Sequence, residues 1–223
     1  ELITVKGLNA LKKADCILYD FLSAPELLEY AKELCEKICV GKKDGLHLKE
    51  QDETNTLLYE KAQEGRTVVR LKGGDPFVFS RGSEEFRYLK DKGIDVEVVP
   101  GITSAFAAPQ SFGVPLTVKN EVQSVAIITG RKSDINAEIE APPSGTLVYL
   151  MAVANIENVV KALRKSGRPD VMPCAFIEKA TRPDTRIVAA NIGTIEEKVK
   201  SEKIKPPAVL VVGDVVSKFR DED

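Results

Sequence analysis

The sequence predicts an α/β protein of two lobes, and three observations lead to that prediction. Short β-rich runs alternate with helix-like stretches along the first half, which is typical of strands joined by helical crossovers into a parallel sheet. In the second half, two strand-like runs follow each other without room for a crossover helix, so an antiparallel pair is expected there. The pattern changes near Lys119-Asn120. We therefore expect an N-terminal lobe at 1–118 with a mainly parallel sheet and a C-terminal lobe at 119–223 with a mixed sheet.

The elements of the first lobe follow from apolar runs and the turn residues that end them. Strands are expected at residues 16–19, 37–40, 67–71 and 96–99. Helices are expected at residues 25–32, 54–63 and 83–92. Gly65 and Gly93 follow the last two helices, and glycine is common just after a helix end.

The second lobe is interpreted by the same rules. Strands are expected at residues 124–129, 146–150, 173–177, 186–191 and 208–212, and helices at residues 156–166 and 194–200. The polar segment 131–144 contains Pro142-Pro143, so we expect a loop there.

Composition excludes several classes of protein. The 223 residues carry a net charge of -2, which gives no basic excess for nucleic acid or membrane binding. No apolar run is long enough to span a bilayer, and no signal peptide is visible, so a cytoplasmic protein is expected. The four cysteines form no CxxC pair and His47 is the single histidine, so we expect free thiols and no metal site.

Two turns that follow predicted strands are candidate ligand sites. Gly73-Gly74-Asp75-Pro76 follows the strand at 67–71, where glycines let a backbone approach a ligand closely. Pro100-Gly101 precedes Thr103 and Ser104, either of which could cap the next helix. An ordinary tight turn and ordinary helix capping remain alternatives for these segments.

Charged residues near strand ends are candidates for chemistry. Asp20 ends the first strand, Lys42-Lys43 follows the second, and Arg81 stands at the head of a helix. Arg81 is suited to grip an anion, because its planar guanidinium can bind a carboxylate at two points. The alternatives are a capping or turn aspartate and solvated surface cations.

Taken together, these stretches resemble the uroporphyrinogen-III C-methyltransferase family of the tetrapyrrole methylase superfamily. The most specific segment is Arg70-Leu71-Lys72-Gly73-Gly74-Asp75-Pro76-Phe77-Val78-Phe79-Ser80-Arg81-Gly82. The similarity extends in order over essentially the whole chain, through Gly113-Val114-Pro115-Leu116-Thr117, Leu150-Met151 and Glu178-Lys179-Ala180-Thr181.

The resemblance implies the tetrapyrrole methylase fold, a homodimer, and two successive methyl transfers from S-adenosyl-L-methionine to uroporphyrinogen III. The products would be S-adenosyl-L-homocysteine and precorrin-2, a precursor of sirohaem and cobalamin. It places the cofactor in a cleft between the lobes, bound by Gly73, Gly74, Asp75, Val78, Thr103, Ser104, Met151 and Ala180. It assigns Asp20 as catalytic base, Lys42 as proton donor and Arg81 to substrate binding. Core packing is the alternative for Met151, and a small turn residue for Ala180.

One departure from the family pattern leaves other functions open. The family opens with a strand and a Gly-Pro-Gly-Asp-Pro loop just before the segment matching Glu1-Leu2, so about 10 to 15 residues are expected to be missing. No residue can be assigned to that loop's role in cofactor binding. The alternatives are a related methyltransferase acting on a later precorrin or on diphthamide, and a non-catalytic family member.

Overall fold

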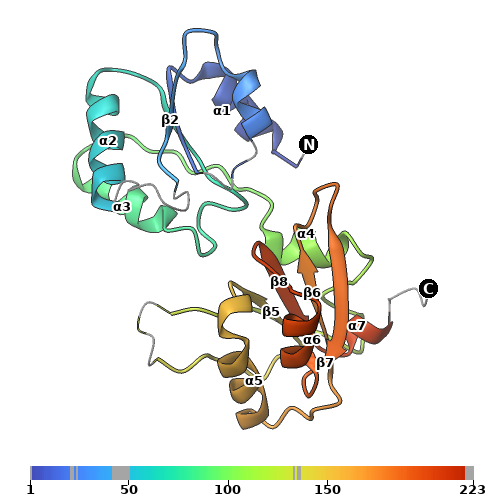
Figure 1. Cartoon of the computed structure of the whole chain (residues 1–223). Helices are drawn as coiled ribbons and strands as arrows, with labels where there is room; N and C mark the ends of the chain where they lie inside the picture. Colours follow the sequence, from blue (N-terminus) through green and yellow to red (C-terminus); the bar gives the residue numbers. More distant parts are fainter. Residues whose placement is uncertain are drawn as a thin grey trace. The chain divides into compact units, whose positions relative to one another are not determined.

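The computed structural model describes residues 2–20, 23, 25–41, 51–132, 134 and 137–218 of the chain (Figure 1). The chain divides into two compact units, Glu1–Thr103 and Ser104–Asp223. This division precedes the joint expected near Lys119-Asn120. The reason is packing, because Ala105 and Ala108 lie in one apolar cluster with Val209 and Val211 of the second unit.

The first unit is built on a three-stranded parallel sheet. Its strands are β1 (Cys16–Tyr19), β2 (Glu36–Cys39) and β3 (Val68–Leu71), in the order β2-β1-β3. Leu18 is aligned with Ile38 on one side and with Arg70 on the other. The parallel sheet predicted for this part is confirmed.

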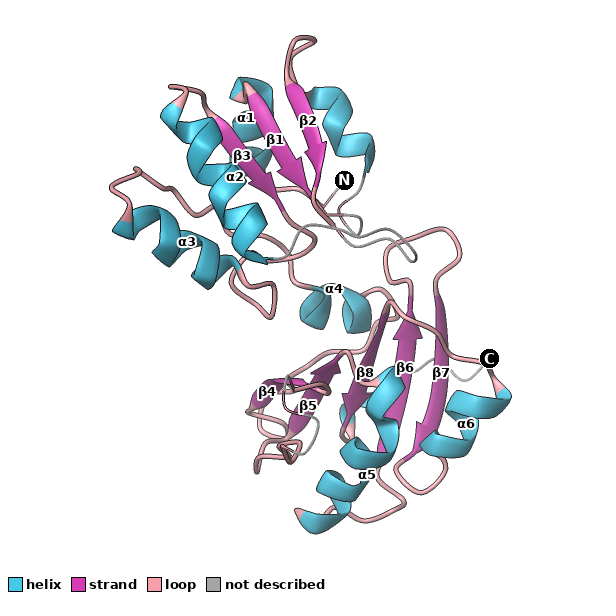
Figure 2. Cartoon of the chain, turned by 60° about the vertical axis from the view of Figure 1, so that its left-hand side comes forward, coloured by secondary structure: helices cyan, strands magenta, loops and turns pink. Residues whose placement is uncertain are grey.

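Helices cover both faces of this sheet (Figure 2). One face packs against α2 (Gln51–Gln63) and α3 (Gly82–Asp91), through the cluster that joins Cys16 and Leu18 to Leu58 and Leu89. The other face, which includes Ile17, packs against α1 (Val5–Lys13) and the 3-10 helix η1 (Pro25–Tyr30). Successive strand residues therefore face opposite layers.

Two parts of the first unit differ from the sequence prediction. Residues 96–99 form no strand in the described structure, although Val96 packs against the cluster of Leu58 and Leu89. An apolar run needs a hydrogen-bonded neighbour to become a strand, and this one pairs with no strand among the described residues. The helix α1 was not predicted, and Thr4 caps it by accepting a 3.1 Å hydrogen bond from the backbone nitrogen of Gly7.

The second unit contains a mixed five-stranded sheet. Its strands are β4 (Val125–Thr129), β5 (Thr146–Leu150), β6 (Pro173–Glu178), β7 (Arg186–Asn191) and β8 (Ala208–Val212). The order is β4-β5-β8-β6-β7, with β4 and β5 parallel and every other pair antiparallel. The predicted mixed sheet and its antiparallel β6-β7 pair are confirmed.

Apolar clusters lie on both faces of the second sheet. One contains residues of α5 (Ile156–Lys165) and α6 (Ile195–Ser201), with the short η2 (Val153–Asn155) leading into α5. The other contains residues of α4 (Ser104–Gln110) and α7 (Val215–Lys218). None of the helices in the described ranges has the length and apolar character needed to cross a membrane.

Candidate functional site

The glycine-rich turn after β3 is tied to a second loop of the same unit by Asp75. Its Oδ1 accepts a 2.8 Å hydrogen bond from the backbone nitrogen of Phe77, and its Oδ2 accepts a 3.0 Å bond from the backbone nitrogen of Gly101. Gly74 has φ +78°, in the region that favours glycine. The structure therefore brings together two of the turns that the sequence singled out.

The two loops approach so closely that side chains are excluded between them. A Cβ atom at Gly101 would lie 2.2 Å from the carbonyl oxygen of Gly74. Within the first loop itself, a Cβ atom at Gly82 would lie 2.0 Å from the carbonyl oxygen of Pro76. Both glycines are required by close backbone approach, and the resulting cradle, with Gly73 and Gly74 exposed, suits a ligand that contacts backbone.

Val78, Thr103 and Ser104 take different positions in this region. The backbone nitrogen of Val78 donates a 3.3 Å hydrogen bond to the carbonyl oxygen of Asp75, which places this half-buried residue within the same turn. Thr103 is 6% exposed and ends the first unit, whereas the exposed Ser104 begins the second unit and α4.

Arg81 occupies the N-cap position of α3 in a left-handed conformation, with φ +61°. Its Nε and Nη2 donate hydrogen bonds of 2.9 and 2.6 Å to the two carboxylate oxygens of Glu84. This pair raises the pKa of the guanidinium and lowers the pKa of Glu84. The side chain of Arg81 is more than half exposed. Its two hydrogen bonds to Glu84 have the two-point geometry by which a guanidinium binds a carboxylate.

Asp20 follows β1 directly and lies in a cluster of charged side chains that the sequence analysis missed. Its Oδ1 accepts a 2.5 Å hydrogen bond from Nη2 of Arg70, and Arg70 and Lys72 both contact Glu85 of α3. Burial is the main cause of the lowered pKa of Lys72, with the neighbouring Arg70 charge as the next contribution. The predicted proton donor Lys42 lies outside the described residues.

A pattern in the sequence could have revealed this cluster. Val68 faces the layer of α2 and α3, and alternation along β3 puts Arg70 on the same face. A charged side chain at a buried strand position needs a partner. Glu85, which lies one helical turn before the buried Leu89, is that partner.

In the second unit, Met151 and Ala180 follow strands that run in the same direction. Both β5 and β6 are antiparallel to β8, and Leu150 and Ile177 are both aligned with Val209. Their carboxyl ends therefore reach one edge of the sheet. Met151 is 46% exposed, so it is not the core residue considered as an alternative, and Ala180 is half-buried.

The backbone near these residues has unusual conformations. Met151, Lys179 and Thr181 have φ values of +59°, +48° and +67°. Non-glycine residues seldom adopt positive φ, and such positions cluster at ligand sites. At the neighbouring end of β4, a Cβ at Gly130 would lie 2.6 Å from the Cα of Ala152.

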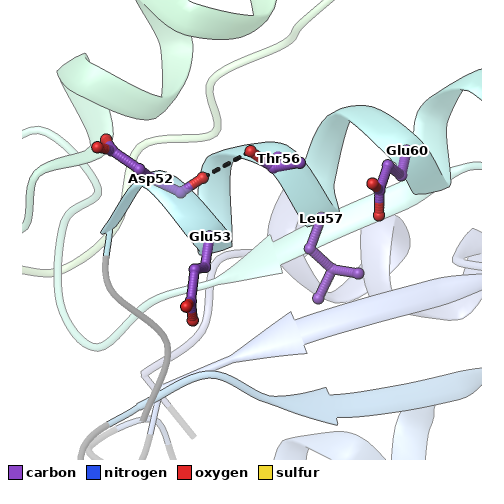
Figure 3. Close-up of a pocket in the computed structure, with 5 residues that line it drawn as sticks. All are labelled: Asp52, Glu53, Thr56, Leu57 and Glu60. Atoms are coloured by element: carbon purple, nitrogen blue, oxygen red, sulfur yellow. Dashed lines mark hydrogen bonds between the residues drawn. The ribbon is translucent and has the colours of Figure 1, made fainter.

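An open pocket on α2 is less suited than the glycine-rich turn to bind an anionic ligand. Figure 3 shows its lining residues Asp52, Glu53, Thr56, Leu57 and Glu60, with the Thr56 hydroxyl donating to the carbonyl oxygen of Asp52 at 2.8 Å. Three of the five are acidic, so the pocket would repel an anionic ligand. Nothing about this pocket favours it over the glycine-rich turn.

Three of the four cysteines are buried, and no metal-binding cluster is found among the described residues. The four cysteines are free, and burial raises the pKa of Cys16 and Cys35 and raises that of Cys174 to about 12. Thiols in such surroundings stay protonated and unreactive. No cluster of three or more histidine, cysteine, aspartate or glutamate side chains is placed to hold a metal ion in the described ranges.

Comparisons with known proteins identify the family of the chain. The family model for tetrapyrrole (corrin/porphyrin) methylases matches residues 1–196. A uroporphyrinogen-III C-methyltransferase of Methanocaldococcus jannaschii is 46% identical over 97% of this chain and 92% of its own length.

Solved structures of similar fold include two methyltransferases. One is a uroporphyrin-III C-methyltransferase of Thermus thermophilus in complex with S-adenosyl homocysteine, with a TM-score of 0.79, 36% identity, and coverage of 98% of this chain and 94% of that one. The other is a cobalt precorrin-4 methyltransferase with a TM-score of 0.80, 27% identity, and coverage of 96% and 90%. The family resemblance seen in the sequence is confirmed.

Proposed function

The chain belongs to the tetrapyrrole methylase family, and we propose that it methylates uroporphyrinogen III with S-adenosyl-L-methionine, twice in succession, to give precorrin-2. The observation that carries the substrate assignment is the 46% identity to the Methanocaldococcus jannaschii enzyme over nearly the full length of both chains. Fold alone does not distinguish substrates, because the cobalt precorrin-4 enzyme has almost the same TM-score as the Thermus thermophilus one. Sequence identity favours uroporphyrinogen III.

We assign cofactor binding to residues of both units. The first unit would contribute the exposed turn of Gly73 and Gly74 with Asp75, Val78 and Thr103, and the second would contribute Ser104, Met151 and Ala180. The cradle held open by Gly101 supports this assignment, because a side chain there would displace the carbonyl of Gly74. Oδ1 of Asp75 accepts a hydrogen bond from its own turn and Oδ2 accepts one from the Gly101 loop, and a carboxylate oxygen can accept a second hydrogen bond.

The chemistry needs alignment and one proton acceptor. Bound S-adenosyl-L-methionine supplies a methyl group on a positively charged sulfur, which keeps the electron pair of the broken carbon–sulfur bond. A pyrrole carbon donates the pair that forms the new carbon–carbon bond, and the cationic ring then loses a proton. We assign Asp20 as the base, because its carboxylate ends β1 beside the glycine turn that ends β3. Lys42 remains our candidate proton donor by family position.

Arg81 is our candidate for binding a substrate carboxylate. Its pair with Glu84 uses Nε and Nη2, so a substrate carboxylate would bind at Nη1 or displace Glu84. Uroporphyrinogen III carries several carboxylates, and a guanidinium binds such groups at two points. Because the side chain of Arg81 is exposed, a substrate carboxylate could reach it in either of these two ways.

We further propose a homodimer in a reducing cytosol. The dimer rests on the family resemblance and on the frequency of two-fold assemblies. The four free cysteines are consistent with a reducing compartment. Light scattering at micromolar concentration tests the dimer, and a monomer would contradict it.

Mass analysis of the reaction tests the proposed function. Uroporphyrinogen III incubated with the protein and S-adenosyl-L-methionine should gain two methyl groups in succession, while a cobalt precorrin offered in parallel should gain none. Methylation of the cobalt precorrin alone would favour the related methyltransferase. A non-catalytic member would methylate neither substrate, and titration with S-adenosyl-L-homocysteine shows whether the protein used in that assay can bind cofactor.

A further inference from the structure

A network of charged side chains lies where β1 and β3 end. It contains two carboxylates, Asp20 and Glu85, and two cations, Arg70 and Lys72. Glu85 Oε1 accepts hydrogen bonds of 3.1 Å from Arg70, from Lys72 and from Gln51 of α2. The network thus joins the strands to both helices that cover this face.

Arg70 occupies the centre of the network and is held on several sides. Its Nε donates to Glu85 and its Nη2 donates to Asp20 at 2.5 Å. Its Nη1 donates to the carbonyl oxygens of Leu71 at 3.0 Å and Leu18 at 3.4 Å, at the ends of two adjacent strands. A planar guanidinium bound at all three nitrogens has little freedom to rotate.

Exposure increases from one end of the network to the other. The side chains of Glu85 and Lys72 are each 6% exposed, that of Arg70 is 14% exposed, and that of Asp20 is 30% exposed. Asp20 is therefore the member that a ligand could reach. Its Oδ1 is engaged by Arg70, whereas its Oδ2 lies 3.8 Å from Nζ of Lys72, which is beyond hydrogen-bond distance.

We propose that Arg70 is a positioning residue for Asp20, held in place by Glu85, so that Oδ2 of Asp20 is presented to accept the proton released after methyl transfer. This inference rests on the proposed function. Arg70 touches neither substrate nor cofactor in this scheme. It acts by fixing the angle and position of the carboxylate, and proton transfer is sensitive to both.

The alternative is that the network only stabilises the first unit. A stabilising role predicts that removing Arg70 lowers the melting temperature and the amount of active protein, and that any loss of activity is the same factor whether or not Asp20 can act as a base. A positioning role predicts that the effect of removing Arg70 on kcat disappears once Asp20 can no longer act as a base. A double-mutant cycle on kcat separates these two roles.

The cycle compares Asp20→Asn, Arg70→Met and the double variant with the unmodified protein. Each kcat is measured with uroporphyrinogen III and calculated from the concentration of active sites, which titration with S-adenosyl-L-homocysteine gives. Arg70→Met should lower kcat roughly 100-fold and leave the KM for S-adenosyl-L-methionine within about two-fold. The double variant should be no slower than Asp20→Asn. Arg70→Lys should recover part of the loss, because it keeps the positive charge. The recovery should be incomplete, because one ammonium cannot bind Asp20 and Glu85 with the geometry of a guanidinium.

Arg66→Met is the matched control. Arg66 lies just before the other end of β3 and forms ion pairs with Glu36 and Glu64, yet has no contact with the network. Its replacement should leave kcat unchanged. If Arg70→Met does not fold, Glu85→Gln tests the same chain of contacts and should lower kcat with Asp20 present but not in the Asp20→Asn background.

Each outcome has one meaning. Losses in kcat that multiply in the double variant, or a KM for S-adenosyl-L-methionine that rises as kcat falls, overturn the positioning role while leaving the proposed function intact. An unmodified protein that binds S-adenosyl-L-homocysteine but methylates no uroporphyrinogen III overturns the proposed function, and this inference with it.

Discussion

The two units place different kinds of groups at the ends of their strands. In the first unit, Asp20, Arg70 and Lys72 put charge at the ends of β1 and β3, supported by the buried Glu85. In the second unit, the corresponding positions after β5 and β6 hold Met151 and Ala180, on backbone with positive φ at and beside them. The groups at the strand ends of the first unit are therefore charged, whereas Met151 and Ala180 of the second unit are apolar and lie on backbone of unusual conformation.

The largest difference should be found in the energetic cost of removing a buried glutamate from each unit. Glu85→Ala leaves the buried Lys72 and Arg70 without their shared carboxylate, and should lower the free energy of unfolding by about 3–5 kcal/mol. Glu178→Ala should cost only about 1–2 kcal/mol, because its ion-pair partner Arg186 is 44% exposed and stays hydrated, which leaves the lost hydrogen bond from the backbone nitrogen of Lys205 as the main cost. Urea unfolding of both variants measures the contrast, and equal losses would contradict it.

The next prediction concerns the contact between the two loops of the first unit. Gly101→Ala would place Cβ 2.2 Å from the carbonyl oxygen of Gly74 and must displace the glycine turn. The affinity for S-adenosyl-L-homocysteine should fall by about 100-fold, corresponding to about 2.7 kcal/mol, as calorimetry can measure. Gly93→Ala is the control, because its Cβ would meet nothing within 4 Å. That variant should lose stability through its positive φ but bind the cofactor normally.

Arg81 tests whether the exposed charge of the first unit serves the substrate. Arg81→Ala should weaken porphyrinogen binding by about 1.5–3 kcal/mol, or roughly ten- to a hundred-fold, while sparing cofactor binding. Arg81→Lys should recover only part of this loss. Steady-state kinetics and calorimetry decide the matter. Unchanged kinetics, or equal loss of cofactor binding, would remove Arg81 from the substrate role.

The smallest predicted effect depends on pH and belongs to the second unit. Cys174 in β6 is completely buried, and its folded-state pKa of about 12 lies above the ordinary thiol value of 9.0. Above pH 9 the unfolded chain loses this proton and the folded chain keeps it, so stability falls by about 1.4 kcal/mol per pH unit until pH approaches the folded pKa. Cys174→Ala should reduce this slope between pH 9 and 10.5, measured by urea unfolding. An unchanged slope would show that the thiol is not responsible.

The sequence predicted most of the fold because its signals are local. The strand at Ala208–Val212 was predicted with its observed limits, and the β6-β7 pair followed from the lack of a crossover. The run at 96–99 was wrongly taken as a strand, because strand formation depends on a neighbour that the run itself does not reveal. The helix α1 was missed, because its helical pattern includes Gly7 and its cap is the single residue Thr4.

The candidate site was predicted less completely than the fold. The glycine turn and Asp20 stand out locally, since each follows a strand. The bond between Asp75 and Gly101 and the network around Arg70 join residues from separate elements, so neither is visible in any one segment. The roles of Asp20, Lys42 and Arg81, the cofactor-binding residues and the domain limits stay predictions.

The hydrogen bond between Asp75 and Gly101 has a consequence for how this site can be transplanted. The segment from Leu71 to Gly82 looks like a portable motif, yet its shape depends on Gly101, which lies 26 positions beyond Asp75 in the chain. Grafting the first segment alone onto another scaffold would leave one oxygen of Asp75 without its partner and the carbonyl of Gly74 without the surface it rests on. The two loops form one structural unit, so a protein designer or a recombination event must transfer both of them to preserve the shape of the turn.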